Sequence, residues 1–222
     1  MKSDTKNLPS YTFKEELVNT ITHLIGLAFA LGVLIFFIVT TITKSCTFVH
    51  MLPYYFYALS MGVVFFVSSA YHSSKFKSKS RAIFRIIDHS DIYIFVFGTY
   101  LPLCLYGVSN VTVSIVAIVL QTLFMVAGIV LNIIPVDNRI IKIIAYFIYI
   151  VDGWLMIFFY PFGIGMDFYV FLFILLGGFV YSIGAITYAI GKKRKYFHSL
   201  FHVFVVLGAV TQFIGIYLLL LA

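Results

Sequence analysis

The sequence predicts an all-α integral membrane protein: a bundle of seven transmembrane helices with a cytoplasmic N-terminus and an external C-terminus. Three observations predict this fold class. Hydrophobic residues make up 62% of the 222 residues, against roughly 45–50% in an ordinary globular protein, and charged residues make up only 10%. Seven stretches reach the length of about 20 apolar residues that a helix needs to cross a bilayer. The basic residues, finally, fall in alternate connections between these stretches.

The apolar stretches follow a polar segment, residues 1–18, which is predicted to be a cytoplasmic tail; residues 19–222 are predicted to form the transmembrane domain. Inside a bilayer each segment must pair its own backbone amides and carbonyls, so every apolar stretch is expected to be helical. The first stretch carries no charge from Leu24 to its end. The predicted spans are Asn19–Thr43, Leu52–Ser74, Ile86–Tyr106, Val111–Ile134, Ile140–Tyr160, Asp167–Ile190 and His198–Ala222.

The distribution of Lys and Arg predicts the orientation of the bundle. All of the 15 basic residues except Lys44 lie in the N-terminal tail or in the second, fourth and sixth connections. Short connections rich in Lys and Arg stay on the cytoplasmic side of a membrane, which places the N-terminus inside and the C-terminus outside. The net charge of +7 is therefore a topology signal. A nucleic-acid partner is excluded, because the basic residues share neither a motif nor a face.

Polar side chains from several predicted helices meet at the cytoplasmic leaflet, where ionisable groups within spans usually carry function. His72 ends the second span, Asp88 and His89 begin the third, and His198 and His202 begin the seventh. The last two are four residues apart and share one helix face. Alone, such a pair is more often a hydrogen-bonded pair or a proton relay, but the third histidine, His72, favours a metal. Three imidazoles and a water form the open, catalytic type of zinc site.

Two further residues are candidates for catalysis beside these histidines. Asp88 is predicted at the same depth, where its carboxylate would offset the charge of the ion and act as a general base. Ser68 precedes His72 by four residues, on the same helix face, and is a candidate donor to a developing oxyanion. The alternative for Ser68 is a serine that bonds to its own helix backbone, which is common in membrane helices.

A second polar stripe lies at the start of the first span, where Glu16, Asn19 and His23 follow helical spacing. Glu16 and Asn19 are expected to cap this helix or to tie it to the basic second connection. His23 is either a hydrogen-bond partner of the ligands or a fourth ligand. The former is preferred, because a fourth protein ligand would close the site to substrate. His89 is expected to support the site without binding the ion, since it lies about 100° around the helix from Asp88.

The ordered set of motifs resembles the haemolysin III branch of the progestin-and-adiponectin-receptor (PAQR) family, within a ceramidase-like superfamily. The resemblance covers essentially the whole chain, and many relatives carry a histidine where this chain has Gln212. It departs further at Asp91 and Asp152, where small or apolar residues are expected. The matching strings are Glu16-x-x-Asn19-x-x-x-His23, Ser68-x-x-x-His72, Asp88-His89 followed by Ile92-Tyr93 and Gly98-Thr99-Tyr100-Leu101-Pro102, Gly153-Trp154, and His198-x-x-x-His202.

The resemblance implies zinc bound by His72, His198 and His202, with Ser68 and Asp88 near the bound water. It implies a zinc-dependent hydrolase of a membrane-lipid amide or ester, with the lipid as substrate or ligand. Two alternatives stay open: a non-enzymatic sensor or receptor of membrane state with structural zinc, and a haemolytic membrane protein. The same residues would serve the hydrolase and the sensor, so they do not distinguish these two functions. Seven apolar spans argue against the soluble form that a secreted cytolysin needs.

Overall fold

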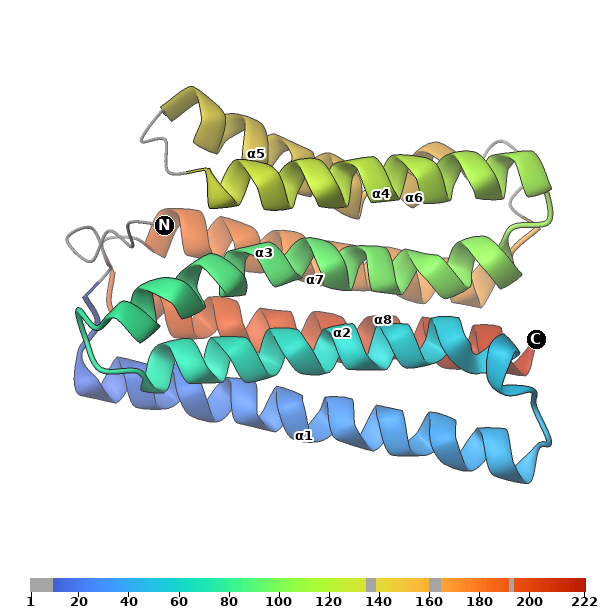
Figure 1. Cartoon of the computed structure of the whole chain (residues 1–222), viewed down its shortest axis with the longest axis horizontal. Coiled ribbons are helices and arrows are strands. Elements are labelled where there is room, and N and C mark those ends of the chain that lie inside the picture. The colour runs from blue at the N-terminus through green and yellow to red at the C-terminus, as the bar shows by residue number, and fades with distance from the viewer. Residues whose placement is uncertain (1–9, 135–138, 160–164, 192–193) are drawn as a thin grey trace.

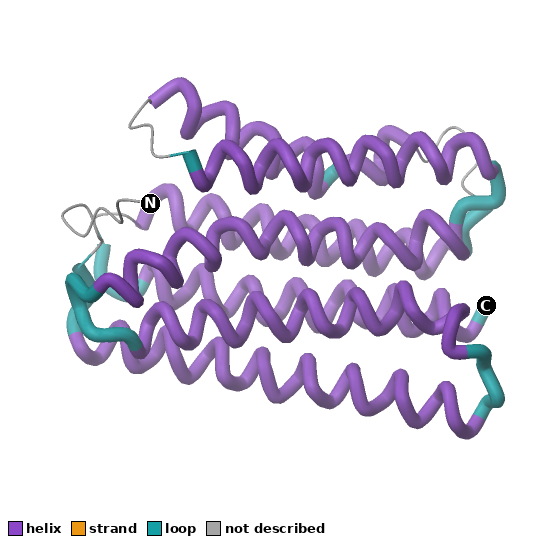
Figure 2. The backbone as a smooth tube through the Cα atoms, in the orientation of Figure 1, coloured by secondary structure: helices purple, strands orange, loops and turns teal. Residues whose placement is uncertain are grey.

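The computed structural model describes residues 10–134, 139–159, 165–191 and 194–222, and within these the protein is helical and has no strand. The helices run side by side along one axis (Figures 1 and 2). In chain order they are α1 (Phe13–Thr43), α2 (Phe48–Ser73), α3 (Lys79–Pro102), a π-helical turn η1 (Leu103–Gly107), α4 (Val111–Ile133), α5 (Arg139–Gly153), α6 (Leu155–Phe159), α7 (Phe168–Gly191) and α8 (Phe197–Leu221).

Consecutive helices pack against one another from α1 to α5, and α7 packs closely on α8, which also contacts α1. The start of α1 and the end of α8 lie at opposite ends of the bundle (Figure 1). The starts of α1, α3 and α8 and the end of α2 meet at the N-terminal end. This is the end at which the sequence places the histidines of the predicted site.

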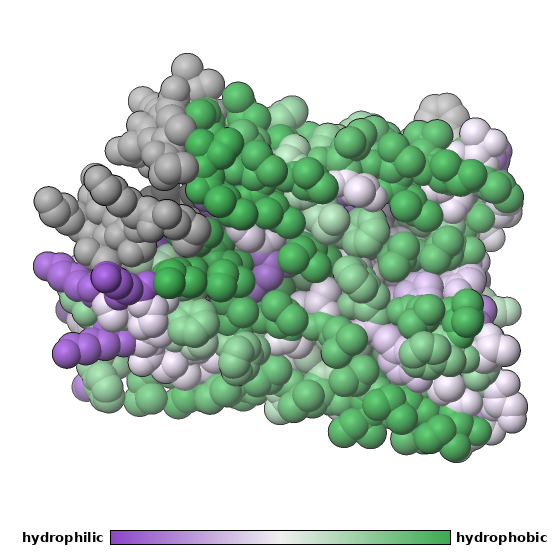
Figure 3. Space-filling model, in the orientation of Figure 1, coloured by the Kyte–Doolittle hydropathy of each residue, from purple (hydrophilic) through white to green (hydrophobic). Residues whose placement is uncertain are grey.

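Five helices of the described chain are long and apolar enough to cross a membrane: α1, α2, α4, α7 and α8. Their apolar side chains face outward, as Ile25 (60% exposed), Leu123 (58%) and Ile186 (58%) illustrate. Figure 3 shows this apolar surface along the bundle, with strongly hydrophilic residues gathered at the N-terminal end. A surface covered by apolar side chains is stable in contact with lipid but not in contact with water. The five do not include α3, which carries several charges, or the shorter helices α5 and α6.

The first helix begins before the predicted span. The Thr12 hydroxyl accepts from the Glu15 amide at 3.3 Å, and the Glu15 carboxylate accepts from the Thr12 amide at 2.9 Å. This reciprocal capping box pairs amides that a helix start leaves without partners. It therefore places Glu16 and Asn19 within α1, whereas the cap itself is formed by Thr12 and Glu15.

A glycine lets α1 and α2 approach closely just beyond the histidines. A Cβ atom at Gly26 would lie 2.6 Å from the ring of Phe65, so the ring occupies the space that a side chain would fill. The same ring lies against His23, with 5.4 Å between the ring centroids. The packing of α1 on α2 therefore helps to fix the position of His23.

The fifth predicted span, Ile140–Tyr160, is not one continuous helix. It is interrupted at Trp154, which separates α5 from α6, and its last residue lies outside the described chain. A glycine, Gly153, directly precedes the interruption, and residues of this type weaken a helix. The sixth and seventh predicted spans correspond to α7 and α8.

Candidate metal centre

Three histidines from two helices converge at the N-terminal end of the bundle. The Nε2 atom of His72, at the end of α2, lies 3.2 Å from Nε2 of His198 and 3.1 Å from Nε2 of His202. The two latter residues lie one turn apart at the start of α8. One ligand atom of each histidine lies within 4.8 Å of the others, and in the described chain no further residue joins this group.

The donor set fits a metal ion. Two nitrogens bound tetrahedrally to zinc at about 2.0–2.1 Å are separated by about 3.3–3.4 Å, close to the separations found here. The Nδ1 atom of His72 lies 2.7 Å from a carboxylate oxygen of Glu16, so Nδ1 carries the proton and the lone pair of Nε2 faces the other two rings. A cation between such lone pairs removes their mutual repulsion. The three histidines therefore form a site that could hold one metal ion.

The His72 ring is oriented by α1. Because Nδ1 of His72 donates to Glu16, it does not accept from the side-chain amide nitrogen of Asn19, which lies 3.3 Å away. The second carboxylate oxygen of Glu16 pairs with Arg81 of α3, whose side chain is only 2% exposed. Arg81 also donates to the Ser74 carbonyl at 2.9 Å. A carboxylate that holds a ligating histidine fixes the ring orientation and raises its basicity.

The other ligand helix is held by α1 as well. Nε2 of His23 forms a short contact with Nδ1 of His202, and both residues are 2% exposed. The Ser199 hydroxyl donates to the side-chain carbonyl of Asn19 at 2.6 Å. His23 thus lies behind His202 and does not join the group of three ligand atoms. No further ligand atom from the described residues occupies the fourth position of a tetrahedral site.

The remaining predicted site residues lie outside this group. The Asp88 carboxylate lies 3.7 Å from Nδ1 of His89, which also contacts the Arg85 carbonyl at 2.8 Å. Neither residue is part of the histidine group. Within the described chain no hydrogen bond joins Asp88 or His89 to the three rings, and the roles predicted for them stay predictions. Ser68 is 2% exposed, and within the described chain its hydroxyl makes no bond to its own helix, whereas its neighbour Ser69 bonds to the Phe65 carbonyl at 2.8 Å.

An aromatic residue that the sequence did not indicate covers the site. The Tyr11 ring stacks on His198 with 4.8 Å between centroids and an interplanar angle of 19°, and lies 5.9 Å from the His72 ring. Burial raises the pKa of the Tyr11 hydroxyl above its ordinary value, so the phenol stays neutral. The sequence feature that could have indicated Tyr11 is the capping box of Thr12 and Glu15, because this motif places Tyr11 directly before α1.

Residues 11–213 match the model of a family described as haemolysin-III related. The chain belongs to this haemolysin III family. The match includes every residue of the candidate metal centre. Together with the apolar helices, membership of this family identifies a membrane protein of haemolysin III type.

Two relatives resemble this chain over most of its length. A protein named hemolysin-3 homolog from Bacillus subtilis (strain 168) is 34% identical over 204 residues, which cover 91% of this chain and 93% of the relative. A protein named hemolysin-3 from Bacillus cereus is 32% identical over 201 residues, which cover 90% of this chain and 89% of the relative. Each alignment thus covers most of this chain and most of the relative.

Proposed function

We propose that this protein is a zinc-dependent hydrolase that cleaves an amide or ester bond of a membrane lipid. One observation carries the proposal: among the described residues three histidines form the group of ligand atoms, and His23 contacts His202 without joining this group. We take His23 as a support of His202, which would leave a fourth position for water and substrate. Structural zinc sites are usually closed by four protein ligands, whereas catalytic sites keep one position open.

In the proposed reaction the metal ion and the side chains of the protein have different roles. A zinc ion held by three imidazoles supplies Lewis-acid activation for hydrolysis. Glu16 orients His72, and its ion pair with Arg81 holds the carboxylate in place. Ser68 lies one turn before His72, and its hydroxyl is free to donate to the oxygen of the scissile carbonyl. Asp88 is the proposed proton acceptor, and it would need to turn from His89 to reach the substrate.

An apolar groove supports a lipid as the substrate. It lies between α1 and α2, has a volume of about 330 Å³, and contains no charged residue in its lining. Leu27, at one end of the lining, follows His23 by one turn, so the groove begins beside the site. An apolar lining of this kind can hold the acyl chain of a lipid. The lining residues are Leu27, Ala30, Leu31, Leu34, Ala58, Leu59, Gly62, Val63 and Phe66.

The proposal is tested by turnover of labelled ceramides and other acyl amides and esters by the purified, zinc-loaded protein in lipid nanodiscs. The unaltered protein is expected to release fatty acid, and His202→Ala is expected to reduce the rate at least a hundredfold. His50→Ala is the matched control, because His50 is an exposed histidine at the opposite end of α2. If His202→Ala keeps both its zinc and its rate, or if no substrate of either class is cleaved, the proposal is wrong.

A non-enzymatic sensor with structural zinc is the second candidate. The observation that favours it is the stacking of Tyr11 on His198, which covers one side of the site. Bound zinc without turnover, in both the unaltered protein and a Tyr11→Ala variant, would support the sensor over the hydrolase. The relatives' name, hemolysin-3, raises haemolysis as a third activity, but the apolar surface of the described helices argues against a soluble cytolysin.

We propose further that the chain crosses the membrane seven times, with α3 as the third span and α5 with α6 as the fifth. Two features support an N-terminus in the cytoplasm and a C-terminus outside: the basic residues fall in alternate connections, and the start of α1 and the end of α8 lie at opposite ends of the bundle (Figure 1). Alkaline phosphatase fused after Ala222 is expected to be active in a bacterial host. Green fluorescent protein at the same position is expected to be dark; the opposite pair of results would overturn this topology.

A further inference from the structure

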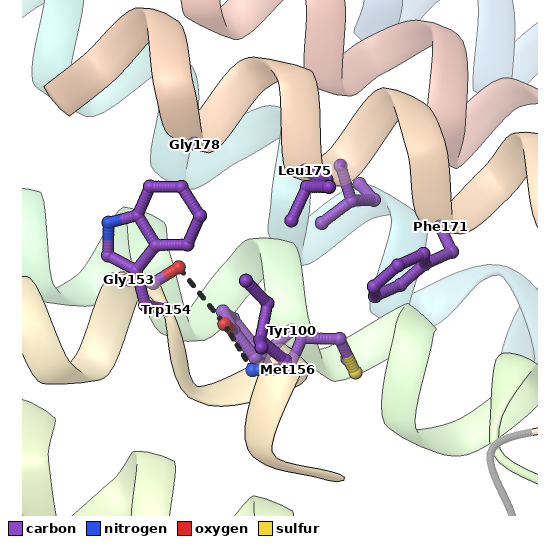
Figure 4. Close-up of a pocket in the computed structure, with 9 residues that line it drawn as sticks. Tyr100, Gly153, Trp154, Met156, Phe171, Leu175 and Gly178 are labelled. Atoms are coloured by element: carbon purple, nitrogen blue, oxygen red, sulfur yellow. Dashed lines mark hydrogen bonds between the residues drawn. The ribbon is translucent and has the colours of Figure 1, made fainter. Parts of the chain in front are cut away.

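The interruption between α5 and α6 is held by side chains from two other helices. In an uninterrupted helix the Met156 amide would donate to the Asp152 carbonyl. Here the Met156 amide donates to the Tyr100 hydroxyl at 3.0 Å, and the Asp152 carbonyl accepts from Nε2 of Gln121 at 3.2 Å. The Tyr100 hydroxyl also donates to the Gly153 carbonyl at 3.2 Å (Figure 4). Residues of α3 and α4 thus stabilise a break in an apolar helix.

Oxygen atoms without partners are buried at this break. Asp152 is 0% exposed, and both of its carboxylate oxygens lack a hydrogen-bond partner in the described chain. Gln121 is also 0% exposed, and its Oε1 atom lacks a partner there as well. Buried polar atoms are almost always satisfied, and an isolated carboxylate is costly in an apolar interior. Among the described residues, no positive charge or hydrogen-bond donor pairs with these oxygen atoms.

We propose that Asp152 and Gln121 bind a monovalent metal cation at the break. One carboxylate and one neutral amide oxygen balance a single positive charge better than a double one, and oxygen is the ligand that hard cations prefer. The bond from Nε2 of Gln121 to the Asp152 carbonyl keeps the free Oε1 atom of the same amide beside this residue. Broken membrane helices place cation sites in this manner, within the bundle and away from lipid.

A small cavity adjoins the break. It has a volume of about 10 Å³, and its lining includes Tyr100, Gly153, Trp154 and Met156 but neither Asp152 nor Gln121. This is on the order of the space that one water needs. The place is distinct from the histidine site. Gly98, two residues before Tyr100, lies against Ser60 of α2, and Ser60 precedes His72 by twelve residues, or about 18 Å of helix.

The test measures the unfolding temperature of the detergent-purified full chain at pH 8.5 in NaCl, in KCl and in N-methyl-D-glucamine chloride at constant ionic strength. A saturable rise of about 5 °C with Na⁺ or K⁺ is expected when the ion exceeds its Kd about a hundredfold. Asp152→Asn is expected to abolish the rise. The matched control is Asp167→Asn, because Asp167 is exposed and accepts from the Tyr169 amide at 2.8 Å, a bond that Asn also makes; this variant is expected to keep the rise.

An unfolding temperature that is the same in all three salts overturns the proposal. A temperature that changes with pH but not with the cation also overturns it, because Asp152 then binds only a proton. If Asp152→Asn yields no folded protein, Gln121→Leu takes its place: the charge stays and one oxygen is lost. The cation that raised the unfolding temperature, measured as ²²Na⁺ or, for K⁺, as ⁸⁶Rb⁺, is expected to bind at least tenfold more weakly than to the unaltered chain. Equal binding by the two proteins, or none by either, contradicts the site.

Discussion

The Nδ1 atom of His72 lies 2.7 Å from Oε2 of Glu16, so a carboxylate on α1 sets the orientation of an imidazole at the end of α2. The other oxygen of the same carboxylate pairs with Arg81 of α3. One side chain therefore connects three helices and directs the lone pair of His72 toward His198 and His202. Several predictions concern this connection and the packing around it.

Glu16→Gln is expected to weaken zinc binding by about 10–100-fold, because an amide holds the His72 ring less firmly and adds no charge. Competition with a fluorescent zinc chelator measures the change. Glu15→Gln is the control: Glu15 caps α1 through Thr12 and the Tyr196 amide, and Gln also completes a capping box. Equal loss of affinity in the two variants would show that the Glu16 contact with His72 has no specific effect.

Arg81→Met is expected to lower the free energy of unfolding by about 3–5 kcal/mol, since it leaves the Glu16 carboxylate without its buried partner. Arg81 also lies over the Tyr71 ring, with 4.8 Å between the guanidinium carbon and the ring centroid. Thermal unfolding in detergent should show a decrease of about 10 °C. Lys79→Met removes an exposed charge from the same helix and should have little effect. A stable Arg81→Met protein would contradict the buried pair.

Gly26→Ala is expected to destabilise the protein by about 1–3 kcal/mol, because the added methyl group would lie 2.6 Å from the Phe65 ring. Gly32→Ala is a matched control on the same helix, where a Cβ atom would meet nothing within 4 Å. There alanine should stabilise α1 by up to about 1 kcal/mol through its helix propensity. The unfolding temperatures of the two variants should therefore move in opposite directions, and a common direction would refute the close approach of α1 and α2.

The residues of the candidate site could be read from the sequence, but their partners could not. His72, His198 and His202 stand out as imidazoles that separate spans bring to one leaflet, and His198 and His202 have the spacing of one helical turn. Arg81 is one of several basic residues in the second connection, and charge patterning assigns all of them to topology. Only the tertiary structure distinguishes Arg81, because the partner of Glu16 depends on how α3 packs against α1.

The spans were predictable where a single helix is apolar throughout, and less so elsewhere. Val111–Ile134 differs from α4 by one residue, because Asn110 caps the helix directly before the apolar run. The fifth span was predicted as continuous, because hydropathy contains no signal for the bonds that Tyr100 and Gln121 make to the backbone near Gly153. These bonds join residues far apart in the sequence, and a pattern along one helix cannot reveal them.

Tyr11→Ala is expected to speed the loss of zinc to EDTA several-fold, because the Tyr11 ring shields His198 by stacking on it. Tyr11→Phe keeps the ring and should lose zinc as slowly as the unaltered protein. Stopped-flow measurements with a chromogenic chelator would separate the two variants. If both lose zinc at the rate of the unaltered chain, Tyr11 does not cover the site.

The metal content of the detergent-purified protein tests the central claim most directly. By elemental mass spectrometry the unaltered chain is predicted to contain about one zinc ion, as expected for a site of three imidazoles. His72→Ala, His198→Ala and His202→Ala are each predicted to contain almost none, and His50→Ala to keep its zinc. Stoichiometric zinc in all three of the first variants, or none in the unaltered protein, would contradict the convergence of these imidazoles on one ion.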